Sequence, residues 1–173
     1  ATADYCGRIL AGGYSDALKN TLHRHITACQ AFDAIGLPIM PYIAAWKIDT
    51  SVIWYEFVSR RFLALFASSP ENLGREFNRA ILDRRVYKHE NVSPDVRELV
   101  LERREIDDQR HRIRQESIQK GATEAVYKVL LPDSSVRWLK DWASVETFAP
   151  DGICLSPGYL ADVSMEMDRK DQV

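Results

Sequence analysis

The sequence has 173 residues, of which 46% are hydrophobic and 28% are charged. This length and composition are typical of one globular domain with a hydrophobic core. The formal net charge of -2 at pH 7 argues against a dedicated nucleic-acid-binding protein, because such proteins usually carry a basic excess or a basic stripe.

The cysteines and the most apolar segment indicate the compartment. The three cysteines, Cys6, Cys29 and Cys154, are far apart in the sequence and lack the spacing of a metal site. Isolated thiols of this kind are typical of a reducing environment. The most apolar segment, residues 35–46, is too short to span a bilayer and contains two prolines. We therefore expect a cytoplasmic protein without membrane insertion.

An amphipathic helix is the first predicted element. Ser15 can cap its start, and Gly36 together with Pro38 marks its end. This helix has one apolar face, which needs a partner surface. The residues of this face recur at helical spacing and are Leu18, Leu22, Ile26, Cys29 and Phe32.

Two strands follow the first helix. Residues 42–49 and 52–58 are rich in β-branched and aromatic side chains, and only a short polar link separates them. This pattern predicts a two-stranded hairpin. Residues 60–66 then have the character of a short helix.

Two longer helices are predicted in the middle of the chain. The first runs over residues 70–84, and Ser68 with Glu71 is a candidate capping box at its start. A polar connection separates it from the second helix, which we expect over residues 94–121. Ser93, followed by proline at the first helical position, marks the start of this second helix.

The last part of the sequence predicts three strands, over residues 123–132, 136–148 and 153–164. Turn-forming residues at 133–135 and 150–152 separate these strands. The full order is therefore two strands, several helices and three strands. This order predicts an α+β fold, with a five-stranded antiparallel sheet and helices over one face.

This layout and several short motifs resemble a PAS domain, the five-stranded sensor module of signalling proteins. Residues 52–73 are similar to the family's strand, short helix and Ser-Pro-Glu-x-Leu helix start, and the whole resemblance covers residues 42–164. Ser134 stands where a turn glycine is usual, which implies a less tight turn. The motifs of the C-terminal half are a strand, a turn, an Arg-Trp strand, a second turn and a closing triplet, at Tyr127–Val129, Asp133–Ser135, Arg137–Trp138, Asp151–Gly152 and Asp162–Ser164.

The resemblance implies a sensory function. PAS domains hold a small ligand or cofactor between the inner sheet face and the helices, or dimerise without one, and they pass changes through flanking helices. The chain then divides into an N-terminal flanking helical segment (1–38), a PAS domain (39–164) and the start of an exit helix (165–173). Because that helix has only begun when the sequence stops, we expect the natural protein to continue into an effector domain, such as a kinase or a cyclase.

Strand alternation and the family layout together predict a ligand pocket. Ser59 stands where many members of the family have an asparagine, which removes a common polar group from the pocket region. The pocket is expected to be lined by Phe62, Phe66, Phe77, Tyr127, Val129 and Leu139.

A second group of residues is predicted to couple the sheet to its surroundings. Asp162 resembles the aspartate that ties the last strand to its neighbour in this family, with Trp138 or Lys140 in reach. Ser164 is expected to cap the exit helix. Trp138 and Trp142 share the sheet face opposite to Leu139, so either the N-terminal helix or a second copy of the chain should cover them. We expect a homodimer with an interface formed by Leu18, Leu22, Ile26 and Trp142.

The cofactor of such a domain is not fixed by the sequence. His89 and His111 lie in polar surroundings, which argues against haem ligation. No cysteine occurs in the Gly-x-Asn-Cys-Arg-Phe motif of light-sensing relatives, which argues against covalent flavin chemistry, while noncovalent flavin stays open. His23 and His25 are expected to be surface residues of the first helix and not metal ligands.

Catalysis by this part of the protein is not expected. The sequence contains no nucleophile elbow, no phosphate-binding glycine loop and no His-Glu-x-x-His pair. Polar groups that converge on the pocket would be needed for an enzyme, and the sequence nominates none. The alternatives to a ligand-binding sensor are a ligand-free interaction or dimerisation module and, less favoured, a small α+β enzyme.

Overall fold

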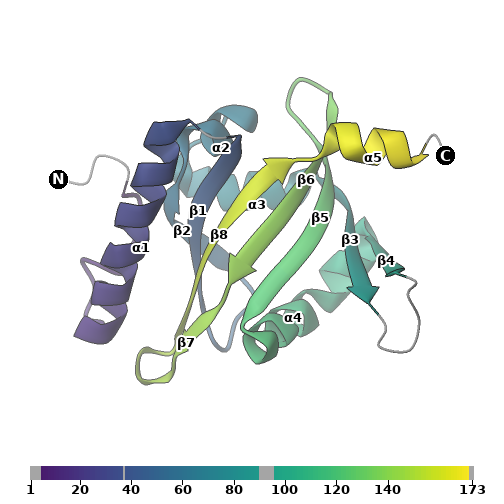
Figure 1. Ribbon diagram of the computed structural model, residues 1–173. Helices are drawn as coiled ribbons and strands as arrows, with labels where there is room; N and C mark the ends of the chain where they lie inside the picture. Colours follow the sequence, from purple (N-terminus) through teal and green to yellow (C-terminus); the bar gives the residue numbers. More distant parts are fainter. Residues whose placement is uncertain (1–4, 37, 90–95, 172–173) are drawn as a thin grey trace.

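The computed structural model describes residues 5–36, 38–89 and 96–171. These residues form five α-helices and one antiparallel sheet of eight strands (Figure 1), so the predicted α+β class is confirmed. The strands are β1 (Ile39–Lys47), β2 (Ile53–Val58), β3 (Ile81–His89), β4 (Val96–Glu102), β5 (Ala122–Leu130), β6 (Val136–Ser144), β7 (Glu146–Phe148) and β8 (Ile153–Asp162). The helices are α1 (Asp16–Ile35), α2 (Arg60–Leu65), α3 (Pro70–Ala80), α4 (Arg103–Lys120) and α5 (Ser164–Asp171).

The strand order of the sheet is β2-β1-β8-β6-β5-β3-β4, and β7 pairs with β8. The five predicted strands correspond to β1, β2, β5, β6 and β8. They are adjacent in the sheet, in the order β2-β1-β8-β6-β5. The first strand therefore lies next to the last one, and their register runs unbroken from Ile39 opposite Ala161 to Lys47 opposite Ile153. The count of five strands is wrong, because β3, β4 and β7 extend the sheet.

The main error lies in the segment predicted as a polar connection and the first part of a long helix. Residues 81–89 and 96–102 form an antiparallel pair instead, with Arg85 hydrogen-bonded to Glu98 across it. α4 begins only at Arg103, where Glu102 and Glu105 form a capping box. Short apolar runs fit a helix or a strand equally well, which explains the wrong choice. The predicted start at Ser93 and Pro94 lies outside the described residues.

Two smaller boundaries also differ from the prediction. The helix that begins at Pro70 ends at Ala80, and its N-cap is Ser69, whose side chain makes no capping hydrogen bond, so the Ser68–Glu71 capping box is wrong. The predicted strand over residues 136–148 is interrupted at Val145. Its last part, β7, pairs with β8 instead of β5.

The sheet separates two apolar layers, and β1 contributes to both. Tyr42 and Ala44 point to the inner layer, where they pack with residues of α2, α3 and α4. Ile43 and Ala45 point to the outer layer, where α1 lies across the sheet (Figure 1). This alternation is the ordinary two-residue period of a strand.

The apolar face of α1 is buried in the outer layer from Leu18 to Cys29, whereas Phe32 is 45% exposed. Leu18, Leu22 and Ile26 pack against Ile43, Phe57 and their neighbours on the sheet and are inaccessible to solvent. Ser15 caps the helix as predicted, because its Oγ accepts the Leu18 N–H. The assignment of Leu18, Leu22 and Ile26 to a dimer interface is wrong, since their partner surface is the sheet of the same chain.

A buried glutamate fixes the N-terminal segment to β2. Glu56 is the extra residue of a β-bulge, because Ile43 pairs with Phe57 while Ala44 pairs with Tyr55. Its carboxylate is fully buried. It accepts hydrogen bonds from the Tyr5 hydroxyl, the backbone N–H groups of Arg8 and Ile9, and the Trp54 indole. The segment thus covers the edge strand of the sheet.

Candidate functional site

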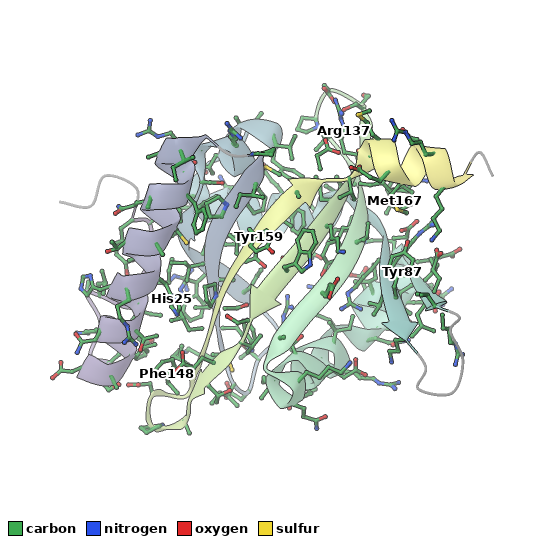
Figure 2. The ribbon with its side chains drawn as sticks, viewed as in Figure 1. His25, Tyr87, Arg137, Phe148, Tyr159 and Met167 are labelled. Carbon is green, nitrogen blue, oxygen red and sulfur yellow. The ribbon has the colours of Figure 1, made fainter. Side chains whose placement is uncertain are left out.

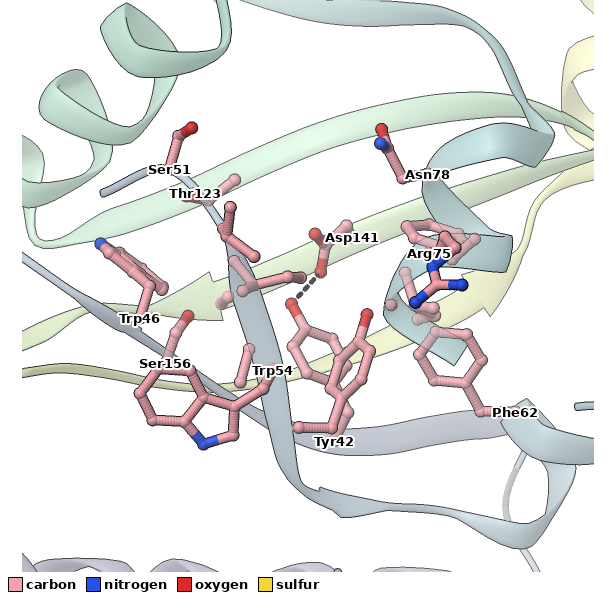
Figure 3. A pocket seen from close by; sticks show the side chains of 18 of the residues that line it. Tyr42, Trp46, Ser51, Trp54, Phe62, Arg75, Asn78, Thr123, Asp141 and Ser156 are labelled. Atoms are coloured by element: carbon pink, nitrogen blue, oxygen red, sulfur yellow. Dashed lines mark hydrogen bonds between the residues drawn. The ribbon is translucent and has the colours of Figure 1, made fainter. Parts of the chain in front are cut away.

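A cavity of about 460 Å³ lies between the inner face of the sheet and helices α3 and α4 (Figure 3). Three of the six predicted pocket residues line it, namely Phe62, Phe77 and Tyr127. The other three, Phe66, Val129 and Leu139, belong to the surrounding apolar core and do not line the cavity. A cavity of this size suits a small organic ligand.

Five aromatic rings form a continuous wall of this cavity. They come from β1, β2, α2, α3 and β5, and consecutive ring centroids are 5.5–5.8 Å apart in edge-to-face contacts. This geometry is favourable for aromatic pairs and fixes each ring against its neighbours. The wall is therefore formed before any ligand arrives. Its members, in order, are Tyr42, Tyr55, Phe62, Phe77 and Tyr127.

Asp141 supplies a buried carboxylate to the same cavity. It lies on β6, only 9% exposed, and its Oδ1 accepts a hydrogen bond of 2.6 Å from the Tyr42 hydroxyl (Figure 3). Burial raises the pKa of Asp141 to about 6, while the hydrogen bond from Tyr42 and the positive charges of Arg114 and Arg84 oppose the shift. Sequence reasoning missed this residue, although Asp141 follows Leu139 by two positions and so shares its inward face.

Gly158 makes room for the contact between Tyr42 and Asp141. It is the β8 residue directly opposite Tyr42. A Cβ atom at position 158 would lie 2.7 Å from the Tyr42 hydroxyl and 2.6 Å from the Trp142 carbonyl oxygen. Both distances are too short for a carbon atom, so a side chain at this position would displace the tyrosine that orients the carboxylate.

Cationic and amide side chains from α3 and α4 also line the cavity. Arg110 donates to Asn78 Oδ1 at 3.2 Å and to Asp107 at 2.8 Å. Arg114 donates from Nε to the Ser51 carbonyl oxygen at 3.4 Å, and its guanidinium lies 5.4 Å from the ring centre of Trp46. The sequence nominated no polar groups for the pocket, and the structure places several at this cavity. Their positions could not be predicted, because the residues of β4 and α4 were assigned to one long helix.

The raised pKa of Asp141 gives a testable effect on stability. The carboxyl group of Asp141 binds its proton more tightly in the folded state than in the unfolded state. The free energy of unfolding therefore falls as the pH rises from about 4 to about 6, and it stays at the lower value above pH 6. Asp141→Asn keeps an acceptor for Tyr42 and does not titrate. We expect it to exceed the wild type in urea unfolding by about 2–3 kcal/mol at pH 7.5 and to match it near pH 4. A wild type that is the more stable protein at pH 7.5 would contradict this assignment.

The predicted coupling residues meet at the junction of β6, β8 and α5. The Trp138 N–H donates to Ser164 Oγ at 2.9 Å, and the Ser164 N–H and hydroxyl donate to Asp162 Oδ1 at 2.9 and 2.5 Å. Asp162 also lies 3.5 Å from the Arg137 guanidinium. Its charged partner is thus Arg137, and not Trp138 or Lys140. Ser164 is the first residue of α5, and its hydroxyl accepts from the neighbouring strand.

The two tryptophans of β6 have different surroundings on the outer face. Trp138 is buried against Met167, and the Arg85 guanidinium lies 4.4 Å from its ring centre. Met167 belongs to α5 (Figure 2). Trp142 stacks on Tyr159, with ring centres 5.0 Å apart. The prediction that the N-terminal helix or a second copy of the chain covers Trp138 is therefore wrong, because α5 covers it. Homodimerisation itself stays a prediction.

The candidate cofactor ligands do not come together. His111 is exposed on α4, and His23 and His25 lie on α1, on the other side of the sheet from the cavity. His89 is the last residue of β3. Within the described ranges, no three His, Cys, Asp or Glu side chains are grouped as a metal site would need. The same residues include no helix with the length and apolar character that crossing a membrane requires.

No sequence-family model matches the chain, and no curated protein matches it either. Among solved structures, it is similar to a light-oxygen-voltage domain examined with a flavin analogue, at 11% identity and a TM-score of 0.47, over 84% of this chain and 91% of that one. It is also similar to the N-terminal PAS/PAC sensor domain of a diguanylate cyclase from Marinobacter aquaeolei, at 14% identity and a TM-score of 0.42, over 75% and 98%. A sensory box histidine kinase/response regulator from Burkholderia thailandensis gives 12% identity and a TM-score of 0.43, over 82% and 89%.

These solved structures are PAS and light-oxygen-voltage sensor domains, the class that the sequence resembles. The identities are low and the chain paths overlap only in part.

Proposed function

We propose that this chain is a PAS-type sensory domain that binds a small ligand in the inner cavity and passes its occupancy to an effector domain through the flanking helices. The observation that supports this most strongly is the cavity, with its aromatic wall and the buried carboxylate of Asp141. Ligand sites are commonly apolar cavities with a few placed polar groups and residues of shifted pKa.

The route from the cavity to the exit helix follows β6. Asp141 faces the cavity, and Trp138, three residues earlier in the same strand, donates its N–H to Ser164 at the start of α5. On the outer face, Met167 of α5 packs against Trp138. A ligand that binds one position of β6 better than another would bias the position of α5 by its difference in affinity.

Gly74 provides the test of ligand binding. It lies in α3 and lines the cavity, and a Cβ atom there meets only ordinary contacts, 3.6 Å from the Ile53 carbonyl oxygen and 3.8 Å from the Tyr55 ring. Gly74→Leu is expected to fill part of the cavity and so to lower the bound fraction of a copurified small molecule. We expect the affinity to fall about tenfold or more, which corresponds to a loss of about 1.4 kcal/mol in binding free energy. Native mass spectrometry and absorption spectra of the purified chain measure this fraction.

Gly74→Ala is the matched control for this experiment. It adds one carbon without a close contact, should retain the ligand, and should stabilise α3 by about 0.5–1 kcal/mol. Equal ligand content in the wild type and both variants would place the molecule elsewhere. A wild type that carries no small molecule and binds none would favour the ligand-free interaction module instead.

A further inference from the structure

Among the charged side chains that line the cavity, Asp141 and Arg114 do not pair with each other. Asp141 accepts one hydrogen bond, from Tyr42 to Oδ1, and no hydrogen bond to Oδ2 occurs within the described residues. Arg114 is held by its Nε–H on the Ser51 carbonyl oxygen, and no carboxylate of the described residues lies within ion-pair distance of it. Both side chains line the same cavity.

The charge of Asp141 is costly without a partner, because this side chain is buried. A buried carboxylate with one hydrogen bond has lost most of its hydration, which is the cause of the raised pKa of Asp141. A ligand group that donates to the open oxygen of Asp141 would replace this hydration with a charge-assisted hydrogen bond. A guanidinium such as that of Arg114 binds a carboxylate in the same way, often with two parallel hydrogen bonds.

Apolar side chains also line this cavity. The aromatic wall borders it on one side, and Ala44, Ala143 and Leu160 line it from the sheet. An occupant that matches all three surroundings has a cationic amine, an anionic carboxylate and a compact apolar body.

We propose that the cavity binds a small zwitterion of the amino-acid type, with its ammonium group at Asp141 and its carboxylate at Arg114. The inference rests on the proposed function, because it requires that the cavity holds a ligand. A dianionic ligand would face Asp141, and a dicationic ligand would face Arg114, Arg110 and Arg75. A neutral molecule would leave both charges without a counter-charge.

The experiment uses the full chain and three probes that share one apolar body. L-phenylalanine carries both charges, 3-phenylpropionate lacks the amine, and 2-phenylethylamine lacks the carboxylate. Isothermal titration calorimetry at pH 7.5 should give L-phenylalanine about tenfold or more tighter binding than either analogue, the factor expected for one charge-assisted hydrogen bond. L-leucine has an aliphatic side chain, so it tests whether the cavity recognises the two charged groups or the aromatic ring.

Two variants assign the ends of the ligand. Asp141→Asn should weaken binding of L-phenylalanine about tenfold while binding of 3-phenylpropionate stays within about twofold of the wild type. Arg114→Gln should weaken L-phenylalanine equally and leave 2-phenylethylamine within about twofold. This crossed pattern cannot arise from a general loss of folding, which would weaken all probes together.

Three results would overturn the inference. They are equal affinities for L-phenylalanine and 3-phenylpropionate, a parallel loss of all probes in both variants, and an absence of saturable binding by L-phenylalanine and L-leucine. A copurified ligand that is not a zwitterion, and that Gly74→Leu expels, would overturn the zwitterion while the sensory function stands. A chain that binds no small molecule at all would overturn both.

Discussion

Replacement of Glu56 by glutamine is expected to lower the free energy of unfolding by about 3–5 kcal/mol, since a buried acceptor of several hydrogen bonds is lost. Oε1 of Glu56 accepts from the Tyr5 hydroxyl at 2.8 Å and from the Ile9 N–H at 3.0 Å. Oε2 accepts from the Arg8 N–H at 2.6 Å and from the Trp54 indole at 2.7 Å. In glutamine, an NH2 group replaces one of the two oxygens. At either position, the two groups that donate to this oxygen would then meet another donor and lose their acceptor.

The loss should appear first in the N-terminal segment. Without the carboxylate, residues 5–9 lose their main tie to β2, so their amide hydrogen exchange should accelerate before the sheet unfolds. Urea unfolding measures the total effect, and Glu166→Gln, on the exposed face of α5, is the matched control. An equal change in both variants would mean that Glu56 does not hold the segment.

Phe62→Ala is the second change for which a large loss is expected, about 3–5 kcal/mol, as for other fully buried phenylalanines. The Phe62 ring is inaccessible to solvent and lies 5.5–6.2 Å from the ring centres of Tyr42, Tyr55, Phe66 and Phe77. Its removal interrupts the aromatic wall and enlarges the cavity. For a domain of this size, the loss corresponds to a fall in melting temperature of about 10 °C.

Phe32→Ala is the control for this substitution. Phe32 is 45% exposed on α1, so its removal should change the free energy of unfolding by no more than about 0.5 kcal/mol. Thermal unfolding of both variants by circular dichroism gives the comparison. A loss below about 1 kcal/mol in Phe62→Ala would show that the wall collapses into the cavity without cost.

The parts of the fold that could be predicted are those with one dominant pattern. The strands β1, β2, β5, β6 and β8 contain β-branched and aromatic residues between clear turn signals, and α1 has a capped start and an apolar stripe. The segment 81–102 has no such signal. Its apolar residues fit a helix until the pairing with β5 is known, because that pairing depends on residues about forty positions away.

The candidate site was less predictable than the fold. Phe62, Phe77 and Tyr127 could be nominated because large aromatic residues on inward faces belong to the core. Asp141 and Tyr42 could have been placed on the inner face by alternation, but their contact requires that β1 and β6 flank β8, which is a tertiary fact. Glu56 gave no signal, because three of its four partners come from a segment without regular structure.

β1 has a consequence for how the two layers can move. Tyr42 and Ala44 belong to the cavity side, and Ile43 and Ala45 to the side covered by α1. A tilt of this strand would move both sets of side chains together, because they alternate along one backbone. A displacement of β1 on the cavity side would therefore also move the side chains that pack against α1.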